Sequence, residues 1–216
     1  MTVAMVEGRF KKELPNRFRA QVLVRGRVIS CYIPTTTKLI PLVPMQNRRV
    51  RLVRNNKGLV LDSLFYRNAW IGLNSVAANK IWFDYLARTS SKPEQLMVER
   101  VLEGYKFDVL DKWTNTAYEV KSVISIKKEI DYPCVHSEHM CDQLNRLKEI
   151  CGKINISFVL IALSPFVRSV RISRRTQFGR LLKDLLLSGG TVTAYRVYGS
   201  AKRRRLASIA VKFSDA

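Results

Sequence analysis

The chain has 216 residues, 47% of them hydrophobic, which is enough to build one large or two small cores and argues against a disordered protein. Lys and Arg number 38 against 17 Asp and Glu, so the net charge of +21 predicts a polyanionic partner, with nucleic acid as the first candidate. The longest apolar run, residues 156–163, is far shorter than the roughly 20 residues that span a bilayer, so we expect no membrane partner.

The first third of the chain has the pattern of a small β-barrel. Residues 20–24 and 28–33 are rich in β-branched and aromatic side chains and flank a tight Arg-Gly-Arg turn. Residues 49–54 alternate charged and apolar side chains as a half-buried strand does, and residues 59–66 supply a further strand. Short strands with basic turns and no long helix favour an OB-like fold, which commonly binds nucleic acid.

A helical connector is expected to follow the barrel. Residues 77–88 carry apolar side chains at helical spacing, and the Ser-Lys-Pro-Glu sequence of residues 91–94 is typical of the start of a helix. We therefore divide the chain into an OB-like nucleic-acid-binding domain, residues 1–75, and a second domain, residues 76–216.

The second domain combines strand and helix patterns. Strands are indicated by β-rich or continuous apolar runs, and helices by apolar residues that share one face and end at a glycine. The predicted order is strand 105–110, strand 116–123, helix 137–151, strand 154–163, helix 176–187 and strand 191–198. This order predicts an α/β domain with a mixed sheet.

The cysteines are expected to be free thiols of an intracellular protein, because their spacing does not suggest a disulfide framework. Cys134, His136, His139 and Cys141 place four zinc-ligand types in one short segment, but zinc sites usually use two separated pairs, so a zinc site is disfavoured and the role of this cluster is left open. The first residues reach Glu7 without the apolar core of a secretion signal, so a cytoplasmic or nucleoid-associated location is expected.

Asp108, Glu119 and Lys121 are the candidate catalytic residues. Asp108 lies in one predicted strand and the other two lie in the next, so a hairpin would bring the carboxylates together, with Glu119 and Lys121 on the same side. The two carboxylates and the Val120 carbonyl would be oxygen ligands for Mg²⁺ or Mn²⁺, and Lys121 would orient or help deprotonate a water for phosphodiester cleavage. Glu99, expected on the preceding helix, is a further acidic candidate. An exposed strand with alternating charges would show the same spacing.

Basic side chains that would hold phosphates lie on both sides of this segment. Basic residues greatly outnumber acidic ones in residues 1–68 and again in residues 166–205, whereas the two kinds balance in residues 69–165. This distribution suits a carboxylate site flanked by surfaces that grip a phosphate backbone, although a ribosome-associated protein or a solvated basic surface would show it too. The nucleic-acid-binding candidates are Arg25, Arg27, Lys38, Arg49, Arg51, Arg171, Arg174, Arg175, Arg203, Arg204 and Arg205.

Several segments match, in the same order, the motifs of one known family. Residues 119–123 reproduce its Glu-Val-Lys-Ser-Val signature, and residues 107–110, Phe-Asp-Val-Leu, are similar to its Arg-Ile-Asp-Phe-Leu strand. Further similar segments are residues 17–20, 34–39, 70–74, 79–81 and 190–196. Over about residues 9–198 the chain thus resembles the sugar fermentation stimulation protein A (SfsA) family. Residues 134–144 depart from the pattern, because they lack the family's Arg, Gly and His, and Thr37 replaces a turn glycine.

The resemblance implies an OB-like barrel followed by a PD-(D/E)XK domain of restriction-endonuclease-like type that uses a divalent metal. It implies that Asp108, Glu119 and Lys121 form an intact catalytic set, and it places Glu99 at the offset of the family's upstream acidic residue. It also favours DNA over RNA as the partner. The alternative is a non-catalytic DNA- or RNA-binding protein that acts in regulation or in a ribosome-like assembly. The sequence leaves open whether the chain forms a homo-oligomer.

Overall fold

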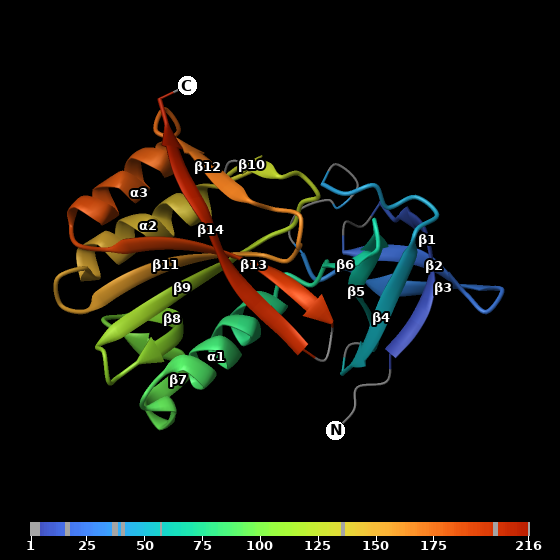
Figure 1. The fold of residues 1–216 in the computed structure, drawn as a ribbon, viewed down its shortest axis with the longest axis horizontal. Helices are drawn as coiled ribbons and strands as arrows, with labels where there is room; N and C mark the ends of the chain where they lie inside the picture. Colours follow the sequence, from blue (N-terminus) through green and yellow to red (C-terminus); the bar gives the residue numbers. More distant parts are fainter. Residues whose placement is uncertain are drawn as a thin grey trace.

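The computed structural model describes residues 5–15, 18–35, 39, 42–56, 58–134, 137–200 and 203–215. Within these residues the strands form two sheets that lie side by side, a smaller one near the N-terminus and a larger one near the C-terminus (Figure 1). We call them the barrel sheet and the large sheet. Among the described residues, no helix has the length and apolar character needed to cross a membrane.

The barrel sheet confirms the OB-like expectation for the first third of the chain. Its strands are ordered β3-β2-β1-β4-β5-β6, and a parallel pairing of Tyr32 with Val60 joins β3 to β5, which curves the sheet toward a barrel. Its strands are β1 (Met5–Glu13), β2 (Arg19–Val24), β3 (Arg27–Tyr32), β4 (Arg49–Asn55), β5 (Gly58–Tyr66) and β6 (Ala69–Gly72).

The large sheet is mixed, as expected for the second domain. Its order is β10-β12-β14-β13-β11-β9-β8-β7, with β9, β11 and β13 parallel and the hairpins β7–β8, β8–β9 and β13–β14 antiparallel. Its strands are β7 (Leu96–Leu102), β8 (Tyr105–Asp111), β9 (Thr116–Val123), β10 (Glu129–Asp131), β11 (Asn155–Ala162), β12 (Ser169–Ser173), β13 (Thr191–Ser200) and β14 (Arg203–Ser214). The helical segments are α1 (Ala77–Thr89), the 3₁₀ turn η1 (Pro93–Gln95), α2 (Glu138–Ile150) and α3 (Gln177–Leu187).

Local sequence explains the elements that support the candidate site. β11 is apolar and buried along nearly its whole length because it lies inside the sheet, with β9 and β13 as parallel neighbours. Helix α2 is capped by Ser137, whose side chain accepts a hydrogen bond from the Met140 N–H, and helix α3 is capped by Thr176, whose side chain accepts one from the Gly179 N–H. The cap therefore fixes the N-terminal half of α2, which includes Gln143.

Two hydrophobic cores enclose the large sheet. One core packs α2 and α3 against one face and includes Leu144 and Phe158. The other runs from the barrel interior, through Ile81 of α1, to Val120 on the opposite face of the large sheet. A hydrogen bond of 2.7 Å from the Gly72 N–H to the Leu163 carbonyl also joins the two sheets. The domain boundary between residues 75 and 76 falls between β6 and α1, and it stays a prediction because the second core crosses it.

Candidate functional site

Asp108 lies on β8, next to the point where the pairing of β8 with β9 ends. The antiparallel pairing of these strands ends at Val109 and Tyr118. Beyond this pair, the Val120 N–H donates a hydrogen bond of 2.8 Å to Asp108 Oδ2, so the carboxylate takes the place of a main-chain acceptor. Asp108 Oδ1 accepts a hydrogen bond of 2.5 Å from Asn79 Nδ2 on α1. The carboxyl group is thereby held between helix α1 and strand β9.

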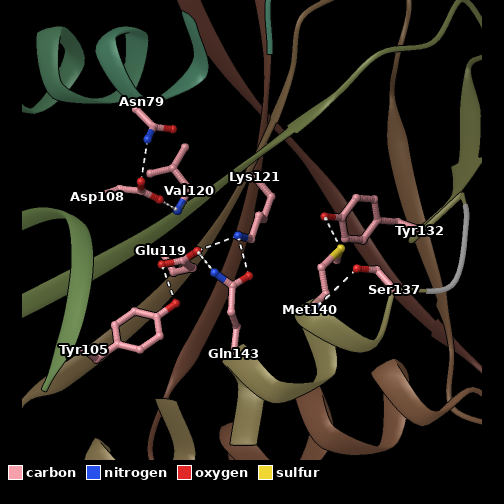
Figure 2. A network of polar contacts seen from close by, with 10 residues as sticks. All are labelled: Asn79, Tyr105, Asp108, Glu119, Val120, Lys121, Tyr132, Ser137, Met140 and Gln143. Carbon is pink, nitrogen blue, oxygen red and sulfur yellow. Dashed lines mark hydrogen bonds and ion pairs between the residues drawn. The ribbon is translucent and has the colours of Figure 1, made fainter. Parts of the chain in front are cut away.

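Glu119 lies on β9 with only 3% of its surface exposed. Its Oε2 accepts a hydrogen bond of 2.9 Å from the Tyr105 hydroxyl, and its Oε1 accepts one of 2.5 Å from Lys121 Nζ and one of 3.3 Å from Gln143 Nε2. Lys121 Nζ also donates to Gln143 Oε1 at 2.8 Å. Figure 2 shows this network beside β9, with Asp108 toward α1 and Glu119 toward α2. Glu119 and Lys121 thus lie on the same side of their strand.

The two carboxyl groups lie close enough to interact electrostatically. Burial, followed by the negative charge of Glu119, raises the pKa of Asp108 to about 6, although the hydrogen bond from Val120 and the charge of Lys121 oppose this rise. Burial and the same Glu119 charge also raise the pKa of Tyr105, so its hydroxyl stays protonated and donates. Negative charge is therefore concentrated here, with Lys121 as the nearby cation.

The chemistry of these groups fits a hard divalent cation. Mg²⁺ is commonly held by one or two carboxylates, with water and substrate phosphates completing its coordination. Asp108 and Glu119 could supply the carboxylates, and Val120 carries a main-chain carbonyl next to them. Within the described ranges no cluster of three or more His, Cys, Asp and Glu side chains has metal-binding geometry. A metal here would consequently depend on few protein ligands.

The expectation that Glu99 lies on a helix is wrong. The segment after α1 forms only the short turn η1, and the chain then enters β7, which pairs with β8 as the edge of the large sheet. Glu99 interrupts this pairing with a φ of +50°, and its side chain, 66% exposed, forms an ion pair of 2.7 Å with Lys106. Its catalytic role stays a prediction, and its observed partner is Lys106.

The nucleic-acid-binding candidates fall into groups that sequence alone did not distinguish. Arg25, Arg27, Arg175 and Arg205 are exposed. Lys38 lies outside the described residues. The structure describes the backbone of Arg203 in β14 but not its side chain.

Two further candidates, Arg49 and Arg51, share a patch on β4. Both form ion pairs with Glu7, at 2.9 and 3.0 Å, and Arg51 stacks over Trp70 with its Cζ 3.6 Å from the ring centroid. Their guanidinium groups are held in place by a carboxylate and by aromatic rings. They keep free N–H donors, because a guanidinium carries five.

Other candidates are partly neutralised by carboxylates far away in sequence. Arg171 on β12 pairs with Glu129 at 3.4 Å and with Asp131 at 2.5 Å, and Arg174 pairs with Asp215 at 3.2 Å. These arginines sit where β10, β12 and the C-terminal end of β14 meet, so counting charges along the chain overstated the free positive charge in this region.

The described side chains of the cysteine and histidine segment do not converge on one point. Cys141 lies buried in the core beneath α2, whereas the exposed Cys134 thiol donates to the Asp131 carbonyl at 3.4 Å. His136 lies outside the described residues.

Three side chains of the network were missed by sequence reasoning. Asn79, Tyr105 and Gln143 contact the two carboxylates from α1, from the start of β8 and from α2. Tyr105 could have been found, because it begins the predicted strand that carries Asp108. The two amides could not, since no local pattern tells which helix covers which face of a sheet.

Comparison with known proteins bears on the fold. No family model matches the chain, and no curated protein matches its sequence. A solved structure, that of Pyrococcus furiosus SfsA in complex with Ca²⁺, is similar with a TM-score of 0.80, over 98% of this chain and 97% of that chain, at 16% sequence identity. The chain has an SfsA-like fold, as its sequence motifs suggested.

Proposed function

We propose that this protein binds nucleic acid, DNA in preference to RNA, and cleaves phosphodiester bonds at a metal-dependent site formed by Asp108, Glu119 and Lys121. The observation that carries the proposal is the placement of a buried and a half-buried carboxyl group so near one another that the charge of Glu119 raises the pKa of Asp108. Perturbed carboxyl pKa values of this kind are typical of functional sites, because a folded protein gains no stability from them.

Asp108, Glu119 and the Val120 carbonyl would hold the metal. A Mg²⁺ or Mn²⁺ ion bound there would neutralise charge on the phosphate and lower the pKa of a bound water. Lys121 would donate hydrogen bonds to the attacking water or to phosphate oxygens, since its ammonium group is held near Glu119. Gln143 would fix the position of Lys121 by accepting one of its hydrogen bonds, at 2.8 Å. Exposed arginines of both sheets would bind the phosphate backbone.

One observation favours a non-catalytic nucleic-acid-binding protein as the second candidate. Every carboxylate oxygen of Asp108 and Glu119 accepts a hydrogen bond from a protein group. Such a satisfied network can be purely structural, linking α1 and α2 to the hairpin. Under this alternative the protein would bind DNA or RNA in regulation or in a nucleoprotein assembly.

A cleavage assay separates the two candidates. Purified protein is incubated with single-stranded and duplex DNA and RNA, with Mg²⁺, with Mn²⁺ and with a chelator, beside the variants Asp108→Asn and Lys121→Met. Lys106→Met is the matched control, because it removes the same charge from the exposed face of β8. We expect cleavage that needs metal and falls by about 100-fold or more in both site variants. Cleavage that survives both substitutions refutes the site, and tight binding without cleavage supports the second candidate.

A further inference from the structure

A cavity lies where the barrel sheet meets the large sheet, apart from the carboxylate network. It has a volume of about 270 Å³, and its lining comes from β4, β5, β6, the start of α1 and the β13–β14 hairpin. Figure 1 shows that hairpin reaching toward the barrel. A second cavity of about 460 Å³ shares Asn74, Ala77, Ile81 and Arg204 with the first. Together they are in the size range of sites for small organic ligands.

Two arginines, one from each sheet, line the first cavity together with one carboxylate, Asp62 of β5. Arg51 comes from β4, where Glu7 and Trp70 hold its guanidinium group in place. Arg204 comes from β14 and is half-buried, and its side chain forms no ion pair or hydrogen bond with any described residue. A partly desolvated guanidinium without a partner is unfavourable, and a bound phosphate offsets that cost through paired hydrogen bonds. Arg204 is the group that lacks a partner, and Arg51 adds a second guanidinium that Glu7 occupies only in part, so the junction favours a bound anion.

The same cavity offers surfaces for a base. Trp70 and Tyr198 line it, and Tyr198 is 38% exposed, so an aromatic ring is open to stacking. The side-chain oxygen of Asn74 is buried without a hydrogen-bond partner among the described residues, which leaves an acceptor for an amino group of a base. Helix α1 starts at the cavity with no side-chain cap and no acidic residue in its first turn, which also favours a bound anion.

From these features we infer that the junction cavity binds one unpaired nucleotide of a nucleic-acid strand. Arg51 and Arg204 bind its phosphate, and its base contacts Trp70 and Tyr198 with Asn74 as acceptor. The inference rests on the proposed function, in that it specifies where an unpaired strand is held. The inference also connects the junction cavity with the carboxylate network, because the cavity lies at the start of α1 and Asn79 of the same helix donates a hydrogen bond to Asp108. A strand bound at the junction is thereby held beside the helix that positions the candidate site.

The first test compares two variants that each remove one positive charge, on opposite faces of β14. Arg204→Ala and Arg205→Ala alter neighbouring residues of β14, whose side chains alternate between the faces of the sheet, and binding of a labelled single-stranded oligonucleotide is measured by fluorescence anisotropy. We expect Arg204→Ala to weaken binding about tenfold and Arg205→Ala about twofold, with unchanged thermal unfolding. Equal losses overturn the cavity assignment and leave only diffuse attraction between charges.

The second test asks whether the cavity recognises a base and whether it requires a nucleic-acid strand. Wild-type protein should bind a strand with bases more tightly than an abasic strand of equal length, and Asn74→Ala should reduce that preference. Equal binding of both strands by the wild type overturns the inference. A nucleoside monophosphate alone should bind far more weakly than the strand, and equally tight binding would assign the cavity to a free nucleotide instead. If the protein cleaves DNA while the cavity variants behave as the control does, the inference fails and the proposed function stands.

Discussion

Replacing Asp108 by asparagine should change the free energy of unfolding more favourably above pH 7 than near pH 4. In the folded chain the pKa of this carboxyl group rises from 3.8 to about 6, mainly because burial disfavours its charged form. The group is protonated in both states below pH 3.8, so it does not change the free energy of unfolding there. As the pH rises from 3.8 to about 6, Asp108 loses its proton in the unfolded chain before it does so in the folded chain, and the free energy of unfolding therefore falls.

The size of the effect follows from the same shift. Each factor of ten in a proton equilibrium corresponds to about 1.4 kcal/mol, so the ionised Asp108 lowers the free energy of unfolding by about 3 kcal/mol above pH 7. Asparagine has nearly the same shape and carries no charge, and because its amide has one acceptor oxygen instead of two, the cost of the lost acceptor is the same at every pH. The free energy of unfolding of Asp108→Asn, relative to the wild type, should therefore increase by about 2.5 kcal/mol between pH 4 and pH 8.

Urea denaturation at several pH values, without divalent metal, measures this difference. Asp131→Asn is a control of opposite sign, because a hydrogen bond from Arg171 lowers the pKa of Asp131, so this carboxylate contributes stability above its unfolded pKa that is lost as the pH falls. If the difference between the wild type and Asp108→Asn did not change with pH, Asp108 would be neither desolvated nor near Glu119, and the reasoning would be refuted.

Three further predictions concern a helix cap, a core and the barrel patch. Thr176→Ala removes the acceptor for the Gly179 N–H, 3.0 Å away, and should lower the free energy of unfolding by about 1 kcal/mol, as seen in a lower Tm. Leu144→Ala opens a cavity beneath α2 and should cost about 2–5 kcal/mol in urea denaturation; a cost below 1 kcal/mol would contradict its burial. Glu7→Gln removes the carboxylate that pairs with Arg49 and Arg51, so oligonucleotide affinity should rise and its salt dependence should steepen; unchanged binding would exclude this patch from the interface.

The core of the candidate site could be predicted because its pattern is local. Two strands joined by a short turn must pair, and alternation along β9 puts Glu119 and Lys121 on one face. The apolar run of β11 and the one-sided apolar face of α2 are local signals of the same kind, and both elements formed close to the expected positions.

The remaining features depend on contacts between distant segments. The Pro-containing start after α1 predicted a helix, but only the turn η1 forms there, since the following residues gain more by pairing with β8. Arg171 appeared free in the sequence, although its partners Glu129 and Asp131 lie about 40 residues earlier. Gln143 reaches Lys121 only because α2 covers that face of the large sheet. Such tertiary pairings cannot be derived from spacing along one chain.

The most direct test of the central claim is the binding of Mn²⁺ by the metal-free protein, measured by isothermal titration calorimetry. The wild type, Asp108→Asn and Glu119→Gln are compared, with Glu149→Gln as a control at an exposed position of α2. A shared site predicts one ion bound per wild-type chain, retention of that binding in the control, and its loss in each of the two site variants. Wild-type binding in either Asp108→Asn or Glu119→Gln would contradict the claim that these two carboxylates hold one cation.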